Sequence, residues 1–470
     1  MTILHPDRLF PPDPTTRGIA REIFSQIQNA PIISPHGHCD PAWFATNAHF
    51  SDPSELLIKP DHYVVRMLIS QGLQFEDLGI VSLGGEATET DPREVWRKFA
   101  RNYYLFSGTP TRLWMDYSFQ EVFGLTQPLG VKTADLYYDH ISERLTQDAY
   151  RPRALYERFG IEMLATTEGA LDPLDHHRTL QQSGWDGVVI TTYRPDEVTD
   201  PDNETFATNL DRFADITGCN LDTWAGYLDA HRKRRTDFRA AGAVATDHGV
   251  PSPLTADLNL ADCIELYARV RGGQANAGDP ALFRAQMLTE MARMSIDDRM
   301  TMQIHPGSHR NYNHDVFRRF GRDRGFDIPR KVNFIDGLAP LLNAVGNEPD
   351  LRIVVFTLDE TTLSRELAPL TGAFPALYLG PSWWFLDAPD GIKRFREAVT
   401  ETAGFYNTVG FNDDTRAFPS LPARHDMARR LDAAFLAERV ADHRMSETEA
   451  HQIAYDLTVT LPRQTYRLID

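Results

Sequence analysis

The sequence predicts an α/β fold, a (β/α)8 barrel of the TIM type with a large helical insertion after its first strand. Three observations predict it: eight short β-like runs are spaced along the chain, helical stretches lie between them, and polar residues follow the runs. No short repeat, low-complexity segment or linker divides the 470 residues. We therefore expect a single elaborated barrel domain over residues 1–470.

The first predicted elements are a helix and a short strand. Apolar residues at positions 19, 23, 24 and 27 predict a helix over residues 17–30, and an apolar run then begins at Ile32 and closes with His36-Gly-His38. If this run is extended, both histidines lie on the same face, because side chains alternate with a period of two. Two imidazoles that point the same way can share one divalent cation.

The long segment over residues 41–153 has helical periodicity and no convincing strand alternation. Tyr63, Val64, Met67 and Leu68 lie near one helical face, and residues 103–123 are rich in aromatic side chains. We therefore predict that residues 41–153 form the helical insertion.

Seven further β-like runs follow the insertion, over residues 161–167, 187–192, 242–246, 300–304, 351–357, 375–379 and 406–411. The stretches between them are predicted to be helical, including most of 195–241 and 251–299. One helix is expected to end before Gly404, which can serve as its C-cap, and the final helix to open at Ser446 with a capping box to Glu449. Helices that alternate with strands in this way are typical of parallel sheets.

A barrel places its active site at the carboxyl ends of its strands, so the residues there are the candidates for function. The most informative of them are Arg194, Asp247, His305, Arg310, Trp383, Asp413, Asp414 and Arg416. Any one of them is more often structural, and the set as a whole carries the argument. Either aspartate, together with His36 and His38, would give a zinc-like ion two nitrogens and one oxygen, with a position left open for water or substrate.

Arg194 and Arg416 could together grip a carboxylate or a phosphate, or each could pair with a structural acid. The chain has 48 basic and 66 acidic residues, a net charge of −18, which argues against nucleic-acid and membrane surfaces. An acidic substrate would therefore need a local cationic pocket. Of the adjacent Trp383 and Trp384, we expect one to face the core and the other the ligand, because neighbours leaving a strand point opposite ways.

Several classes of protein are disfavoured by the sequence. Three widely spaced cysteines predict neither a disulfide framework nor a thiolate metal site, and they fit a reducing cytoplasm. We expect neither a signal peptide nor a transmembrane helix. Phosphate-binding, dinucleotide and Gly-x-Ser-x-Gly motifs do not occur in a fitting context, so no nucleotide cofactor is expected.

Short motifs along nearly the whole chain resemble those of the uronate isomerase (glucuronate isomerase) family of the amidohydrolase superfamily. They are His36-Gly-His38, Asp61-His62-Tyr63-x-x-Arg66, Thr192-Tyr193-Arg194-Pro195-Asp196, Asp247-His248-Gly249, Met302-Gln303-Ile304-His305 with Arg310-Asn311-x-Asn313, Trp383-Trp384-Phe385, and Asp414-Thr415-Arg416 with Arg424-His425. Two motifs depart from the family pattern. His-Gly-His-Cys stands where the family more often has His-Cys-His-Leu, and Asp-Asp-Thr-Arg where it more often has Thr-Asp-Ser-Arg.

The resemblance implies roles for particular residues. It makes His36, His38 and Asp414 the metal ligands, which favours Asp414 over Asp413. It implies a sugar-acid pocket, covered by the insertion over the barrel mouth, and lined by Arg194, Arg416, Tyr63, His62, His305 and Trp383. Arg310 and Asp247, which stand in the same motifs, complete the expected substrate-binding set.

The activity implied is aldose–ketose isomerisation of hexuronates, D-glucuronate to D-fructuronate or D-galacturonate to D-tagaturonate, through a cis-enediol. We expect Asp414 to be the base and Tyr63 and His62 to assist proton movement. One divalent ion, zinc in preference, is expected, since no lysine ends the fourth run and no histidine the sixth to hold a second ion. A metal-dependent hydrolase and a non-catalytic sugar-acid-binding protein are the alternatives. We also expect a homo-oligomer.

Overall fold

Parallel strands form the centre of the molecule in the computed structural model, which describes residues 3–468. Met1 and Thr2, part of the segment in which a signal peptide was considered, lie outside the described residues. The strands are β1 (Ile32–Ser34), β2 (Ile161–Ala165), β3 (Glu168–Gly169), β4 (Val189–Ile190), β5 (Tyr193–Arg194), β6 (Ala245–His248), β7 (Thr301–Ile304), β8 (Ser308–His309), β9 (Ile328–Pro329), β10 (Ile353–Val355) and β11 (Leu377–Leu379).

The pairing of these strands follows the order of a barrel. β1 pairs with β2 and β2 with β4, all parallel. After short breaks, the second and third runs continue as β3 and β5, which pair with each other, and the sheet then passes through β6, β7 and β10 to β11. The predicted (β/α)8 fold is confirmed.

The eighth run closes the barrel without forming a regular strand. Thr408 makes an isolated parallel bridge to Leu379. Further along, the Asp414 amide donates to the His36 carbonyl at 3.2 Å, which joins the last run to the first. The prediction of a strand over residues 406–411 is wrong, because Gly410 has a φ of +85° and turns the chain there. A Cβ at Gly410 would lie 2.4 Å from the Leu457 carbonyl oxygen, so only glycine fits this approach.

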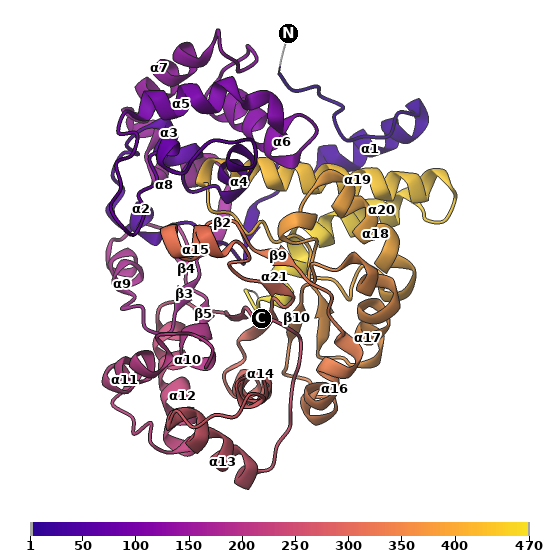
Figure 1. Cartoon of the computed structure of the whole chain (residues 1–470). Helices are drawn as coiled ribbons and strands as arrows, with labels where there is room; N and C mark the ends of the chain where they lie inside the picture. The colour runs from indigo at the N-terminus through magenta and orange to yellow at the C-terminus, as the bar shows by residue number, and fades with distance from the viewer. Residues whose placement is uncertain (1–2, 469–470) are drawn as a thin grey trace.

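The helices between β1 and β2 all belong to the predicted insertion or directly follow it. They are α2 (Pro41–Thr46), α3 (Pro53–Leu57), α4 (His62–Ser70), α5 (Pro92–Arg101), α6 (Pro110–Tyr117), α7 (Ala134–Leu145) and α8 (Pro152–Arg158). No strand forms among residues 41–153, all of which the structure describes. Figure 1 shows these helices gathered on one side of the molecule, above the strands in this view. Trp96 and Phe119 of this segment share one apolar cluster with Ile32 of β1 and Leu164 of β2, so the insertion packs directly on the barrel.

The remaining helices surround the strands. They are α1 (Pro14–Ile27), α9 (Asp175–Gln182), α10 (Asp196–Thr199), α11 (Phe206–Thr217), α12 (Trp224–Ala240), α13 (Leu260–Arg271), α14 (Asp279–Asp298), α15 (His314–Phe320), α16 (Phe334–Val345), α17 (Ala368–Ala373), α18 (Pro389–Ala403), α19 (Leu421–Ala441), α20 (Glu447–Tyr455) and α21 (Leu461–Thr465). The Gly404 C-cap and the capping box of Ser446 and Glu449 both form as predicted. Among residues 3–468, no helix is long and apolar enough to cross a membrane.

Candidate active site

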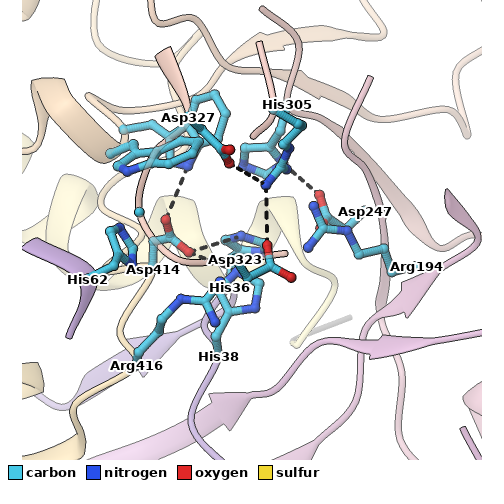
Figure 2. Close-up of a pocket in the computed structure, with 14 residues that line it drawn as sticks. His36, His38, His62, Arg194, Asp247, His305, Asp323, Asp327, Asp414 and Arg416 are labelled. Carbon is cyan, nitrogen blue, oxygen red and sulfur yellow. Dashed lines mark hydrogen bonds and ion pairs between the residues drawn. The ribbon is translucent and has the colours of Figure 1, made fainter. Parts of the chain in front are cut away.

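A pocket of about 520 Å³ opens at the carboxyl ends of the strands (Figure 2). The pocket is lined by His36, His38, His62, Arg194, Asp247, His305, Arg310, Asp323, Gly325, Asp327, Trp383, Trp384, Asp414 and Arg416. These residues come from most strand ends of the barrel, and His62 comes from α4 of the inserted helices.

Among the predicted site residues, which all lie in the described part of the chain, Tyr63 alone does not line this pocket. Its ring stacks on that of His62, with centroids 4.5 Å apart, and meets the edge of Trp114. Both residues are placed by the start of α4, where the Asp61 carboxylate caps the helix by accepting from the Tyr63 amide at 2.9 Å. Burial raises the pKa of Tyr63 well above its usual value, so its phenol stays protonated.

Three side chains converge as a metal site requires. His38 Nε2 lies 3.0 Å and His36 Nε2 3.5 Å from Asp414 Oδ1. Asp414 Oδ1 is buried, and neither of these two contacts is a well-formed hydrogen bond. Two nitrogens and one oxygen that face one another in this way could hold a divalent ion and leave a coordination position open. Asp414 Oδ2 is occupied separately, since it accepts from Trp383 Nε1 at 3.1 Å.

The protonation states of His38 and Asp414 fit this grouping. Burial lowers the pKa of His38 to about 4, with a further contribution from Arg416, so the ring is neutral, which is the form that binds metals. Burial would raise the pKa of Asp414, but the close ring nitrogens of His36 and His38 outweigh it and hold that pKa well below its usual value. Asp414 is therefore ionised across the physiological pH range.

Asp413, the other aspartate considered as a ligand, faces away from this group. Its side chain is fully buried, and it accepts from His425 Nε2 at 3.0 Å and from the Thr415 amide at 3.2 Å. Its charge is therefore engaged behind the pocket rather than in it.

Arg194, Asp247 and His305 form a connected row on the pocket wall, as Figure 2 shows. Arg194 Nε lies 2.9 Å from Asp196 and 3.3 Å from Asp247, and Asp247 Oδ1 accepts from His305 Nδ1 at 2.6 Å. The opposite nitrogen of His305, Nε2, is buried without a hydrogen-bond partner. This nitrogen is free to bind a polar ligand atom.

The other two arginines of the pocket differ in how they are paired. Arg310 lies 3.1 Å from Asp327 and 3.7 Å from Asp323. Arg416 forms no ion pair with any residue of the described range 3–468. A half-buried guanidinium that forms no ion pair and lines the pocket is available for an anionic ligand.

The sequence did not predict Asp323, Gly325, Asp327 or Trp384 in the pocket. The first three lie on the loop between α15 and β9, and no strand-end rule reaches that loop. Gly325 has a φ of +81°, and a Cβ there would lie 2.9 Å from the Cβ of His62, so the glycine lets the loop meet α4. The sequence of this loop is rich in arginine, aspartate and glycine, and that composition was the available sequence signal for its place in the pocket.

Both tryptophans of the pair line the pocket, which corrects the expectation that they face opposite ways. Trp384 has a φ of +52°, so the chain turns between the two side chains instead of continuing as a strand. Their ring centroids lie 5.6 Å apart, and Trp383 also meets the edge of His305 at 4.6 Å.

The profile of the family described as glucuronate isomerase matches residues 15–464. The chain belongs to this family. It is 57% identical over 468 residues to a uronate isomerase of Mesorhizobium japonicum, with all of both chains covered. It superposes with a TM-score of 0.98 on the glucuronate isomerase of Caulobacter crescentus, at 54% identity over 100% of this chain and 98% of that one.

A more distant uronate isomerase, from Thermotoga maritima, has a TM-score of 0.91 at 24% identity, covering 98% of this chain and 99% of that one, and this likeness shows the fold alone. Family membership confirms the predicted resemblance. It favours an isomerase of hexuronates over the hydrolase considered from the sequence.

Proposed function

We propose that this protein interconverts a hexuronate and its ketose, D-glucuronate and D-fructuronate or D-galacturonate and D-tagaturonate. The observation that carries the proposal is the ionised carboxylate of Asp414, held between two histidines in a pocket that also contains the unpaired Arg416. The first group can move a carbon-bound proton and the second can hold the acid group of the substrate.

The reaction begins when the sugar ring opens and exposes an aldehyde at C1. Asp414 takes the C2 proton to give a cis-enediol and returns it to C1, so that C2 becomes the ketone. A second proton passes from O2 to O1 in the same conversion. Asp414 is suited to the first transfer because its carboxylate is ionised and fixed by Trp383.

His62 and Tyr63 assist the transfer between the two oxygens. Burial lowers the pKa of His62 to about 3, with Arg416 adding to the effect, so His62 is neutral and can accept or donate one proton through its ring. Tyr63 stacks directly behind it and stays protonated, which makes its hydroxyl a donor.

The carboxylate of the substrate binds Arg416, with the terminal nitrogens of Arg194 as a second cationic contact. Arg416 is favoured because Arg194 Nε is already engaged by Asp196 and Asp247. His305 binds a hydroxyl or carbonyl oxygen of the substrate through Nε2. Arg310 and Asp247 complete the polar wall, and the tryptophan pair offers apolar faces to the sugar carbons.

One divalent ion fits the donor set of His36, His38 and Asp414, and zinc is the ion that this set of two nitrogens and one oxygen suits best. When bound, it would supply positive charge that polarises oxygens at C1 and C2. A second group, of His36, Asp247 and His305, shares His36 with the first. We therefore propose one ion per chain.

The proposal extends to the setting of the site. Residues 41–153 act as an insertion over the barrel mouth, supported by the place of His62 on the pocket wall and by the close approach of Gly325 to it. The protein works in the cytoplasm, which its three free cysteines fit. It forms a homo-oligomer, which size-exclusion chromatography with light scattering tests.

The deciding experiment incubates the purified protein with D-glucuronate, D-galacturonate and a neutral hexose in D2O. Proton NMR then follows exchange of the C2 proton and formation of the ketose. Exchange and ketose formation with a hexuronate alone support the proposal. Hydrolysis of an ester or lactone probe without exchange would favour the hydrolase, and binding without either reaction would favour a sugar-acid-binding protein.

A further inference from the structure

Asp414 has a backbone conformation that the surrounding structure must maintain. Its φ is +47°, in the left-handed region, which is unfavourable for a residue other than glycine. Two backbone bonds hold the flanking peptides against the first strand. The Asp414 amide donates to His36 O at 3.2 Å, and the His38 amide donates to Thr415 O at 2.8 Å.

The side chain of Asp413 reaches across Asp414, the residue with the left-handed backbone conformation. Its Oδ1 accepts from the Thr415 amide at 3.2 Å, so the carboxylate bridges the turn at Asp414. Its Oδ2 accepts from His425 Nε2 at 3.0 Å. Asp413 is completely buried, so this carboxylate is oriented by protein groups rather than by solvent.

Arg424 holds the other end of the same residue. Its Nη1 donates to Asp413 O at 2.9 Å and to Asp387 Oδ2 at 2.8 Å. Its guanidinium lies 3.7 Å from the ring centroid of Trp114 and 5.8 Å from that of Tyr63, both on the inserted helices. Arg424 is 3% exposed, so removal of its partners would leave a buried charge.

Arg424 and His425 are consecutive residues of α19, and they bind the carbonyl and the carboxylate of Asp413. Within residues 3–468, neither lines the pocket, and neither forms a hydrogen bond or ion pair with His36, His38 or Asp414. The group that both residues bind is Asp413, the neighbour of Asp414.

We propose that Arg424 and His425 are positioning residues that clamp Asp413 and so aim the Asp414 carboxylate at His36 and His38. The inference rests on the proposed role of Asp414 as base and metal ligand. It gives a function to the Arg424-His425 motif, which the pocket itself does not use. Outer groups that orient a metal ligand typically change metal affinity or activity by 10- to 100-fold, and this is the effect expected here.

The test compares His425→Phe, which removes the hydrogen bond, with His425→Gln, whose amide nitrogen can still donate to Asp413. His231→Phe is the matched control. His231 is also a buried histidine, it lies on α12, and it forms a hydrogen bond of 2.8 Å with Tyr193, which does not line the pocket. Zinc affinity of the metal-free proteins is measured by competition with a chromophoric chelator. Thermal stability, and kcat and KM at saturating zinc, are measured on the same samples.

We expect His425→Phe to lose 10- to 100-fold in zinc affinity and to lower kcat more than it raises KM. His425→Gln should recover most of both, and His231→Phe should lower stability without changing zinc affinity. A folded His425→Phe protein with the wild-type zinc affinity and kcat overturns the proposal, as does an equal loss in the His231 control.

If His425→Phe does not fold, Arg424→Lys carries the same test. Lysine retains the charge but cannot serve both acceptors from a planar group while stacked on Trp114. A weakened zinc affinity then supports the clamp, and an unchanged one overturns it. A wild-type protein that fails to isomerise hexuronates would refute the proposed function. The comparison of zinc affinities would still test the clamp, because zinc affinity is measured without substrate.

Discussion

Replacing Asp414 by asparagine removes the proposed base and metal ligand with almost no change in side-chain volume. The side chain is fixed at one end, where Oδ2 accepts from Trp383 at 3.1 Å. An asparagine keeps that bond only by placing its oxygen there, which turns its NH2 group toward His36 and His38. The amide nitrogen can neither accept the C2 proton nor bind a cation.

Loss of a general base alone costs roughly 10²- to 10⁴-fold in rate. That range corresponds to about 3–5 kcal/mol of transition-state stabilisation. The same substitution also removes the only oxygen from the proposed donor set. We therefore expect a fall in kcat at the upper end of this range, about 10⁴-fold, with the fold retained.

The assay follows exchange of the C2 proton in D2O by NMR, together with ketose formation, at saturating hexuronate and zinc. Asp456→Asn is the matched control, because Asp456 is also a buried aspartate, in the carboxyl-terminal helices, and accepts hydrogen bonds from Tyr406 at 2.9 Å and Gln452 at 3.1 Å. The control should retain wild-type turnover. A folded Asp414→Asn protein that exchanges the C2 proton at the wild-type rate would remove Asp414 from the role of base.

Four further predictions follow from the site and its surroundings. Arg416→Met should raise KM for hexuronates at least ~30-fold, because removal of one partner from a hydrogen-bonded charge pair shielded from water costs about 2–5 kcal/mol. The zinc affinity should not fall, and steady-state kinetics and chelator competition check both. Tyr63→Phe keeps the ring stacked on its neighbour but removes the hydroxyl, so kcat should fall at least ~10-fold with KM little changed. Wild-type protein should bind one equivalent of zinc and His38→Ala none under the same conditions, as measured by elemental analysis after gel filtration. Burial raises the pKa of Glu168 to about 7, against its hydrogen bonds from two threonines, so protonation of Glu168 favours the folded state. The contribution of Glu168 to stability should be greatest below pH ~4.5 and fall by about 3 kcal/mol as the pH rises to 7, and urea unfolding of Glu168→Gln should lack this part of the pH dependence.

The strand-end rule explains why much of the site could be predicted from the sequence. His36 and His38 lie just beyond β1 and Asp414 beyond the eighth run, at the junction where the barrel closes. Any closed barrel brings its first and last strands together, so topology predicts that the two histidines meet Asp413 or Asp414, and the family resemblance favours Asp414. The same rule located Arg194, which ends β5.

The unpredicted residues depend on backbone turns that no periodicity reports. Trp384 enters the pocket because its φ is positive, which reverses the alternation expected of a strand. Asp323 and Asp327 lie on a loop whose course is fixed by the short β8–β9 pair and by the ion pair of Arg310 with Asp327. These are contacts between segments far from any predicted strand, and only the folded chain specifies them.

The charges of the pocket give a physical reason for an acidic substrate in a protein whose net charge is −18. Arg194 is balanced by Asp196 and Asp247, and Arg310 is balanced by Asp327. Arg416 has no such partner in the described chain, yet the pKa values of His38 and His62 are lowered in part by its charge. A bound carboxylate would supply the missing negative charge, and it would do so beside the residues proposed to move protons. We therefore propose that Arg416 links recognition of the acid group to the chemistry at C1 and C2, and a neutral hexose of the same size lacks the group that would complete the site.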